Sequence, residues 1–600
     1  MAKRTLIELL GGYTNGDHDS SGKKFWVETV TGSTNRVSIT RFSKYISRFF
    51  DKLTKVVSYT QSRTYGALLC VFGVLSLVIC FLKDYFGLYT DIPVDALMIG
   101  VALSLLSIPF FVSDKPLSVA LQTNSVTDFI FFEFFCIRRM HKNDSEQGIS
   151  PILGAVLGAL LAALGAFVPL WTVALGLALA MYVFLTFLSP EFSFFSIFII
   201  MPYLTFDTDG VVLAALVALT LISYARKVAL GKRVYYFEQY DAGLFIMLFC
   251  ILISGIFVKG VESFVSSVVM ILLGMGYVLS SSLVTNRRLA DCLINAVIIS
   301  AIPVSVIAIV EAIVQLIQHG FSSFAGVSAT FDQPYTLAIF LLVSLLFSMY
   351  FVDVRRRRAA KVLYAVTTVI NLIALFFTMS FWAFGALVIG SIAFLTQKMR
   401  HGAGLSILFL SLFAYGLLFI SGEYIDAIVS NDLVASLGLA DSMRSWQASA
   451  EMLRDNIFLG VGIGEESFIQ EIVEYLPSFE YHNSGSFLLE IACEAGVISL
   501  GAFIMIYIIR VRHRGIYQPY VKNSQVSKIS SYTTVITVIL MIYGAFNYIW
   551  ADMTTYYLFW CVFGLGSAAL RVAKSEFDDR VAYFSDGSAE DSSSIDISIR

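Results

Sequence analysis

The feature that most constrains this chain is a series of apolar segments, each long enough to cross a membrane, between residues 66 and 570. A transmembrane helix needs roughly 20 apolar residues, because the hydrocarbon core is about 30 Å thick. Backbone polar groups find no water inside a bilayer, so segments of this length are expected to be helices. Only 14% of the 600 residues are charged, well below the roughly 25% of a soluble domain. We therefore expect an all-α, polytopic transmembrane helix bundle.

The predicted spans are residues 66–83, 94–112, 152–168, 170–188, 191–205, 209–225, 241–258, 262–282, 290–317, 334–352, 361–378, 380–396, 404–421, 484–509, 530–549 and 552–570. The segment 191–205 is marginal in length and is expected to be re-entrant or strongly distorted. The predicted total is therefore about 14 to 16 helices. Residues 126–137 are apolar but too short to cross, so we expect them in the membrane interface.

Clusters of Lys and Arg alternate with connections that are poor in them. The clusters lie at 136–142, 226–233, 287–288, 355–361, 398–400 and 510–528. In the predicted order of spans they all fall on the side of the amino terminus, whereas the long connection 421–483 falls on the other side. The positive-inside rule then places both termini in the cytoplasm and this connection outside. Clusters that alternate with spans set orientation, so membrane lipids are expected partners and nucleic acid is not.

The predicted organisation has a polar, cytosolic amino-terminal part followed by membrane helices and one large external loop. Its parts are a cytosolic tail (1–65), a transmembrane pair with an interfacial segment (66–150), a transmembrane core (151–420), the external loop (421–483), the carboxy-terminal transmembrane helices (484–572) and an acidic, serine-rich cytosolic tail (573–600). Residues 1–40 and the final tail have the composition of disordered segments. Within the first part, residues 41–57 combine an apolar stripe with a basic face. That pattern is typical of an interfacial helix, and packing into the bundle is the alternative.

The external loop is the leading place for a site of chemistry. Asp441 is the expected N-cap of a helix over 442–454, three glycines at 460, 462 and 464 predict a flexible turn, and 465–476 is predicted as a second short helix. Asn483 or Ser484 is expected to cap the next transmembrane helix.

Two arginines and one histidine are the chemically notable groups of this loop. A guanidinium such as that of Arg444 or Arg454 suits a phosphate or diphosphate, which it can hold through two parallel hydrogen bonds. His482, at the end of the loop, has a side chain that can act as a general base near neutral pH. The alternatives are an ion pair of Arg444 with Glu451 and a capping role for the histidine.

The carboxylates of Glu311, Glu490 and Glu494 lie inside predicted spans, away from their ends. Intramembrane carboxylates are functional candidates, and a protonated contact between helices is the alternative. Metal-ligand spacings and phosphate-binding loops are absent from the sequence, so no metal and no cofactor are expected.

From Arg444 to Gly496 the sequence resembles the bacterial O-antigen ligase and polymerase superfamily. That family carries an Arg and a Trp in an external loop, then a GVGxG turn, then HNS, then a Glu and a Gly in the following helix. The matching residues here are Arg444 with Trp446, the turn 460–464, His482 with Asn483 and Ser484, and Glu494 with Gly496. Weaker similarities occur at 189–191 and 330–338, so the resemblance covers roughly residues 150–570. One departure is Phe381, where family ligases carry a second, anion-binding arginine after a serine.

The resemblance implies a metal-independent, inverting glycosyltransferase of the bacterial cytoplasmic membrane. Its donor would be a glycan linked to a polyprenyl diphosphate such as undecaprenyl diphosphate, and its acceptor a glycan or lipid. Arg444 and His482 would be catalytic, the first binding the diphosphate and the second acting on the acceptor hydroxyl. Substrate contacts would come from Arg454, Trp446, Asn483 and Glu494.

Several alternatives stay open beside that reading. The resemblance does not separate a ligase from a polymerase. A polysaccharide or lipid transporter or flippase without catalysis is the alternative from another class, and it would place functional charges inside the membrane at broken helices. A scaffold-like member of the family is a third, because of Phe381.

Overall fold

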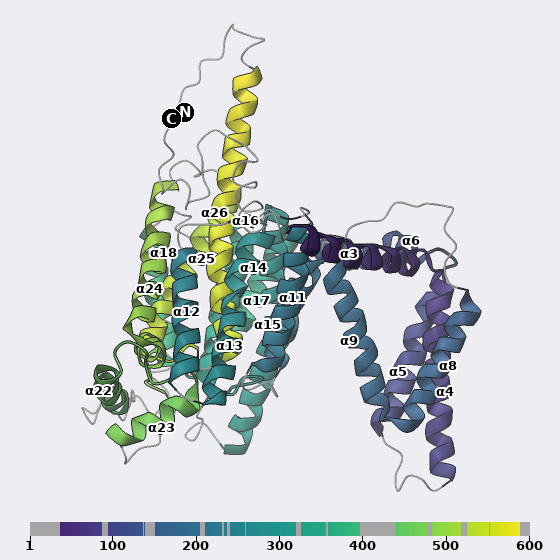
Figure 1. The fold of residues 1–600 in the computed structure, drawn as a ribbon, viewed down its shortest axis with the longest axis horizontal. Helices are drawn as coiled ribbons and strands as arrows, with labels where there is room; N and C mark the ends of the chain where they lie inside the picture. The colour runs from purple at the N-terminus through teal and green to yellow at the C-terminus, as the bar shows by residue number, and fades with distance from the viewer. Residues whose placement is uncertain are drawn as a thin grey trace. The chain divides into compact units, whose positions relative to one another are not determined.

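The computed structural model of the protein describes residues 36–86, 94–135, 137, 150–204, 210–230, 233, 235–236, 241–258, 260–319, 326–355, 358–396, 439–476, 483–517, 525–550 and 552–587. Within these ranges every element is a helix, and the fold is all-α as predicted (Figure 1). The described residues fall into two compact units. The smaller lies within Lys23–Phe195 and Leu219–Arg233, and the larger within Ser196–Ala218 and Val234–Arg600.

Ten of the described helices are long and apolar enough to cross a membrane, and four shorter apolar helices accompany them. The protein is therefore polytopic, and its lipid-facing helices contact membrane lipids. The predicted span 404–421 lies outside the described residues. The span 191–205, expected to be distorted, is a short α-helix, α10 (Pro190–Ile200), followed by a 3₁₀ turn, η2 (Met201–Tyr203).

The smaller unit holds the amino-terminal helices. They are α3 (Arg36–Tyr59), α4 (Ser62–Tyr85), α5 (Val94–Phe111), α6 (Leu117–Thr123), α7 (Ser125–Thr127), the π-helix η1 (Asp128–Phe134), α8 (Pro151–Phe167) and α9 (Leu170–Leu188). Helices α8 and α9 pack with α4 and α5, although both belong to the predicted core 151–420. Helices α10 and α11 (Val211–Ala229) contribute residues to both units.

Helix α3 runs across the direction of α4, α5 and α8 within the smaller unit (Figure 1). It is longer than the predicted 41–57. Phe50 stacks on Phe187 of α9 at 4.7 Å between ring centroids, which fixes one face of the helix. Tyr45 and Phe49 are 74% and 60% exposed, and Arg48 is exposed beside them. A helix that crosses the spans and leaves apolar and basic side chains uncovered has the character of an interfacial helix.

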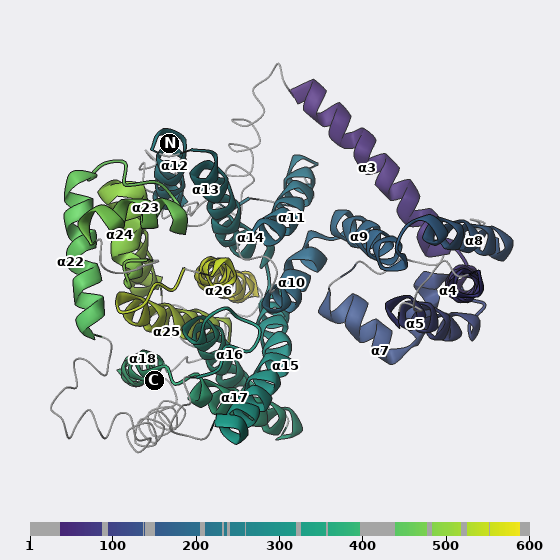
Figure 2. The same ribbon diagram turned by 90° about the horizontal axis from the view of Figure 1, so that it is seen from below.

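The larger unit is built around its two most buried spans, α16 (Pro334–Val354) and α26 (Met553–Gly587). The other helices are α12 (Asp241–Phe257), α13 (Val261–Gly274), α14 (Gly276–Leu283), α15 (Arg287–His319), α17 (Arg358–Phe377), α18 (Phe381–Thr396), α22 (Leu439–Asp455), α23 (Glu465–Tyr475), α24 (Phe487–Tyr517) and α25 (Gln525–Ala545). Figure 2 shows α26 inside the ring that its neighbours form. Trp550 packs edge-on against Phe487 and Phe559 at 5.4 and 5.5 Å, so aromatic rings fill the core near the start of α26.

The carboxy-terminal tail, predicted to be disordered from residue 573, instead begins as helix. Helix α26 continues to Gly587. The stretch 576–584 has no Gly or Pro to end the helix. It mixes charged and apolar residues, which is compatible with a helix that continues beyond the membrane surface.

Charged side chains of the larger unit meet at one end of the bundle. Asp291 of α15 lies 3.9 Å from Arg287 and 3.6 Å from Arg355, which follows α16. Lys528 of α25 lies 3.0 Å from Asp353 of α16. Three basic clusters that are far apart in sequence therefore share one end, as the alternation of basic and non-basic connections predicted.

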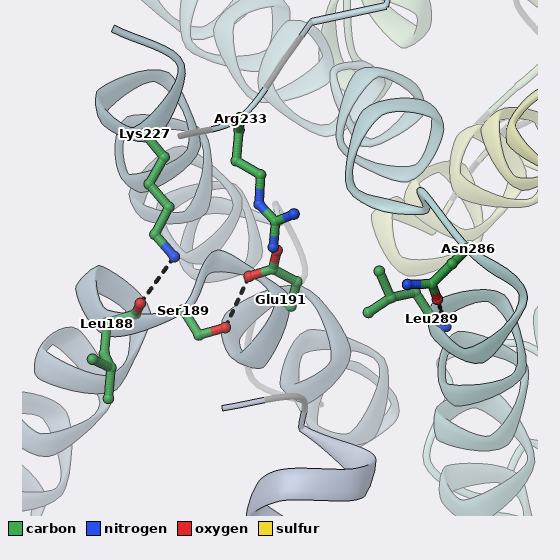
Figure 3. Close-up of polar contacts among 7 residues, drawn as sticks. All are labelled: Leu188, Ser189, Glu191, Lys227, Arg233, Asn286 and Leu289. Carbon is green, nitrogen blue, oxygen red and sulfur yellow. Dashed lines mark hydrogen bonds and ion pairs between the residues drawn. The ribbon is translucent and has the colours of Figure 1, made fainter. Parts of the chain in front are cut away.

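A buried ion pair fixes the start of α10 (Figure 3). The Glu191 side chain is 2% exposed and pairs with Arg233, and the hydroxyl of Ser189 donates to its second oxygen at 2.8 Å. Lys227 closes the preceding helix by donating to the carbonyl of Leu188 at 2.9 Å. The residues 189–191, which resemble a family motif, thus form a structural joint within the smaller unit. Figure 3 also shows Asn286, whose side chain accepts from the backbone of Leu289 at 2.9 Å and caps α15.

We expect Arg233→Ala to lower the melting temperature more than the double change Glu191→Gln with Arg233→Ala. The single change leaves a carboxylate buried without its cation, whereas the double change removes the charge as well. Removing one partner of a fully buried pair costs about 3–5 kcal/mol. Because Arg233 is 33% exposed, we expect the loss of stability here to be smaller than for a fully buried pair. Thermal unfolding of the purified protein measures it, and a double variant that melts lower than the single one would contradict this account.

Candidate functional site

The described part of the predicted external loop is two helices, α22 and α23, at one end of α24 in the larger unit (Figure 1). Helix α22 starts at Leu439, so the prediction of Asp441 as N-cap is wrong. The residue lies inside the first turn, and Arg444 lies beyond it. The cation therefore stands further from the positive end of the helix dipole than the sequence predicted, and its position is less unfavourable. Helix α23 (Glu465–Tyr475) confirms the prediction of a second short helix over 465–476.

A small hydrophobic core attaches both loop helices to α24. It contains Met452 of α22, Phe468 and Ile472 of α23, Val461 of the turn between them, and Cys493 of α24. The hydroxyl of Tyr475, at the end of α23, donates to Asp455 at 2.8 Å. This hydrogen bond raises the pKa of Tyr475 to about 12, so the hydroxyl stays protonated and joins the two helix ends at neutral pH. The loop helices form one folded layer on the bundle.

The glycine turn 460–464 is bound to a break in α24. The helix is interrupted at Gly496, where φ is +82°. The interruption frees backbone groups, and the turn pairs with them: the amide of Val461 donates to the carbonyl of Cys493 at 2.8 Å, and the amide of Val497 donates to the carbonyl of Ile457 at 2.9 Å. A break inside a membrane helix is tolerated where other groups satisfy its backbone. The turn predicted to be flexible is here a fixed joint.

Glycine is required on both sides of this joint. Gly460 has φ of +72°, and a Cβ there would collide with the carbonyl oxygens of Cys493 and Glu494. A Cβ at Gly496 would collide with the carbonyl oxygen of Phe458. Both positions combine a backbone conformation that L side chains rarely adopt with close approach of two backbones.

Two buried carboxylates of α24 bind the turns before and after α23. Glu494 accepts from the amide of Gly464 at 3.0 Å, and Glu490 accepts from the amide of Ser484 at 2.6 Å. The carboxylates are 4% and 1% exposed. The contact that the structure gives Glu494 is thus with the glycine turn, and its predicted role in substrate binding stays a prediction.

The prediction that Asn483 or Ser484 caps α24 is wrong, because the helix begins at Phe487. The side chain of Asn483 accepts from the amide of Gly485 at 2.9 Å instead, and Gly485 has φ of +70°. The chain therefore changes direction just before the helix starts. Gly485 permits this because glycine adopts positive φ without a steric cost. His482 lies outside the described residues.

The amino-terminal half of α22 contacts the turn that contains Asn483. The hydroxyl of Ser445 donates to the carbonyl of Asn483 at 3.2 Å, which joins the helix to the HNS turn. The Nε1 atom of Trp446 lies 3.7 Å from a Cβ built at Gly485. Arg444, which precedes Ser445 in the chain, is exposed. The structure therefore brings Trp446 next to the turn that contains Asn483, which lies 37 positions later in the sequence.

Arg454 lies apart from this group. It is ten residues beyond Arg444 on the same helix, which corresponds to about 15 Å along the axis at 1.5 Å per residue. Both arginines are exposed. Because of this separation, the two guanidinium groups do not hold one phosphate together in this arrangement.

A row of aromatic rings leads from Trp446 to the start of α18. The ring of Trp446 lies 6.2 Å from that of Phe546, which stacks on Trp382 at 4.1 Å with an angle of 7° between planes. Phe381 is the first residue of α18 and precedes Trp382. The position at which family ligases carry a second arginine therefore belongs to the same end of the bundle as Arg444.

Sequence reasoning missed a strained pair of turns beside α18. Ala329 and Met379 have φ of +51° and +53°, values that non-glycine residues seldom adopt. Glu311 accepts from the amide of Ala329 at 2.8 Å and holds the first turn. The only sequence signal was the similarity of 330–338 to a family segment, since strain at Ala and Met leaves no mark in composition.

Hydroxyl groups link these turns to the bundle. The hydroxyls of Ser380 and Tyr543 lie 2.9 Å apart, and Tyr543 also donates to the carbonyl of Tyr335 at 3.3 Å. In the described part of the chain, no group of three or more His, Cys, Asp or Glu side chains is arranged to hold a metal ion.

These features define a polytopic α-helical membrane protein with a folded loop layer fixed to a broken membrane helix. No protein-family model matches the chain, and no curated protein matches it.

Replacing Gly496 by Ala should release the loop layer, whereas Gly501→Ala on the same helix should not. The first change strains the backbone and collides with Phe458, while a Cβ at Gly501 meets nothing within 4 Å. At φ of +82° and ψ of 166°, a region that essentially only glycine adopts, the strain alone costs roughly 1–3 kcal/mol, and Gly→Ala inside a helix gains roughly 0.5–1 kcal/mol. We expect a lower melting temperature and faster proteolysis between 439 and 476 for Gly496→Ala only. Equal behaviour of the two variants would contradict the docked joint.

Proposed function

We propose that the protein is an integral membrane glycosyltransferase of the O-antigen ligase or polymerase type. It would transfer or polymerise a glycan carried on a polyprenyl diphosphate, at the external face of a bacterial cytoplasmic membrane. The observation that carries the proposal is the contact between the part of α22 that bears Arg444 and Trp446 and the turn that contains Asn483. These residues also carry the family resemblance, and the loop layer that holds them is fixed to the bundle by the remaining motif glycines.

The chemistry follows from the side chains at this junction. Arg444 would bind the diphosphate of the donor and stabilise the negative charge that develops as the glycan leaves, which a preorganised cation does well where water is excluded. His482, which precedes Asn483 in the chain, would take the proton of the acceptor hydroxyl. The exposed position of Arg444 leaves it accessible to a lipid-linked substrate.

The diphosphate-binding side of the proposed site is less complete than in family ligases. Phe381 has no charge with which to replace the second arginine, and Arg454 lies about 15 Å along α22 from Arg444. A single guanidinium would therefore bind the donor diphosphate, and the aromatic row from Trp446 to Trp382 offers ring faces on which a sugar can stack.

The transporter alternative has one structural observation in its favour. Helix α24 is broken at Gly496, near the buried Glu490 and Glu494, and broken helices with buried charges are typical of transporter sites. Both carboxylates and the freed backbone groups are, however, bound by the loop layer. Because the protein's own loop occupies the break, we interpret the break as a structural connection and not as a substrate site.

The proposed orientation predicts which residues are accessible from outside the cell. A cysteine placed at Glu474, exposed on α23, should react with a membrane-impermeant maleimide in intact cells. A cysteine at Ser575, exposed towards the end of α26, should react only after lysis. The unaltered chain is the control for its native cysteines. The reverse labelling would contradict an external site.

Arg444→Lys and His482→Ala should both reduce transfer while leaving membrane insertion intact. Lysine keeps the charge but loses the planar fork that holds two oxygens at once. Loss of a general base typically lowers a rate 10²–10⁴-fold, and we expect a decrease of this order for His482→Ala. The purified protein in lipid would be given a polyprenyl-diphosphate glycan and acceptors, and release of polyprenyl diphosphate would be followed without added metal.

Arg454→Ala is the matched control, because this arginine lies on the same helix but apart from the junction. We expect it to turn over nearly as fast as the unaltered protein. Turnover of both Arg444→Lys and His482→Ala at the unaltered rate would contradict the catalytic proposal and favour the transporter.

A further inference from the structure

The smaller unit contains a partly open cavity of about 400 Å³ between α4, α5, α8 and α9. It lies at the end of α4 that is remote from α3. Its lining includes Ser76, Cys80 and Lys83 of α4, Gly165 of α8, and Leu170 and Trp171 of α9. None of these residues belongs to the candidate site, which lies in the other unit.

The cavity exists because α4 and α8 pack closely at one end and keep small side chains at the other. A Cβ at Gly154 would lie 2.5 Å from the carbonyl oxygen of Thr64, and one at Gly158 would collide with Leu68. These glycines let the two helices touch, as small residues do in membrane helix pairs. Beyond the buried Phe72, the facing residues are Ser76 and Gly165, which are too small to fill the space.

Ser76 is a polar group inside this otherwise largely apolar cavity. It is 6% exposed, and its hydroxyl oxygen has no hydrogen-bond partner among the described residues. A serine in a helix commonly donates to the carbonyl four residues earlier, and this one does not. A buried hydroxyl without a partner costs free energy, so a polar atom of a ligand would stabilise it.

Lys83 stands at the rim with its ammonium group. It donates to the carbonyl of Ala166 at 2.7 Å, which holds the charge over the cavity end of α8. The next residue, Asp84, is an exposed carboxylate. The ammonium brings a positive charge to the rim of the cavity, and this charge attracts an anion.

Exposed aromatic side chains surround this end of the unit. Tyr85 of α4 is 83% exposed, Phe167 of α8 is 91% exposed and Trp171 of α9 is 53% exposed. Aromatic rings at the ends of membrane helices are typical of the interface between lipid and water. The cavity therefore opens where lipid headgroups lie, and its apolar interior extends towards the acyl chains.

We propose that this cavity binds a membrane lipid with an anionic phosphate headgroup. One chain of the lipid enters the apolar space, the phosphate lies at Lys83, and an oxygen of the lipid binds the hydroxyl of Ser76. A volume of about 400 Å³ falls in the range of roughly 300–1,000 Å³ that ligand sites have. The inference goes beyond the proposed transferase function and does not depend on it.

Photoactivatable lipids would test the site in the full-length protein reconstituted in membranes. The probes are a diacyl phosphatidylglycerol, a polyprenyl monophosphate and a net-neutral phosphatidylcholine, each with a photoreactive chain. Peptide mapping should locate the phosphate-lipid cross-links at 76–83 and 165–171. Preference for the diacyl or for the polyprenyl probe identifies the source of the phosphate, and either preference supports the proposal. Equal labelling by the neutral probe would overturn it.

Two pairs of variants separate the cavity from its surroundings. Gly165→Leu fills the cavity and should abolish the cross-link, whereas Gly176→Leu on α9, where a Cβ meets nothing within 4 Å, should not. Lys83→Gln should weaken labelling by anionic probes about fivefold, the equivalent of about 1 kcal/mol for one cation near the membrane surface. Lys115→Gln is its control, since Lys115 is exposed and does not line the cavity. Melting temperatures verify folding, and unchanged labelling of folded Gly165→Leu would overturn the proposal.

Discussion

The pairing of the glycine turn with the broken helix α24 is the interaction on which the arrangement of the loop depends. Two backbone hydrogen bonds, from Val461 to Cys493 and from Val497 to Ile457, replace the helical bonds that are lost at Gly496. Inside a membrane the freed amide and carbonyl groups have no water to bind. The backbone of the loop therefore forms the hydrogen bonds that the broken helix cannot form itself. The same contacts fix α22 and α23 against the bundle. The position of Arg444 and Trp446 is thus a consequence of backbone satisfaction in α24.

The loop layer and the bundle share their buried polar groups. Glu494 and Glu490 are accessible to almost no solvent, and each accepts an amide of the loop rather than a side-chain cation. Buried carboxylates are costly unless hydrogen-bonded, so these contacts stabilise the helix and the loop together. This arrangement also explains why residues 460–464 and 494–496 occur as one motif: Gly460 faces the carbonyls of Cys493 and Glu494 beside the break, and the amide of Gly464 donates to Glu494.

The periodicity and length of the apolar segments were enough to predict the helices, because the bilayer leaves the backbone few alternatives. The residues at which helices begin were harder to predict from the sequence. Asp441 is a good capping residue by type, yet the helix starts earlier, and Asn483 forms a turn although it could cap α24. The positive φ values of Ala329 and Met379 and the cavity beside Ser76 depend on packing between distant segments, so no local pattern predicts them.

The central claim is that Arg444, on the part of α22 beside Asn483, holds the diphosphate of a lipid-linked donor. An electron cryomicroscopy structure of the full-length protein in lipid, with a non-hydrolysable polyprenyl-diphosphate glycan analogue bound, tests it directly. The account predicts density for the diphosphate within hydrogen-bonding distance of the Arg444 guanidinium, about 2.7–2.9 Å for such charged pairs, with the glycan beside Trp446. Density for the analogue at the break in α24, between Glu490 and Glu494, with none at Arg444, would contradict it.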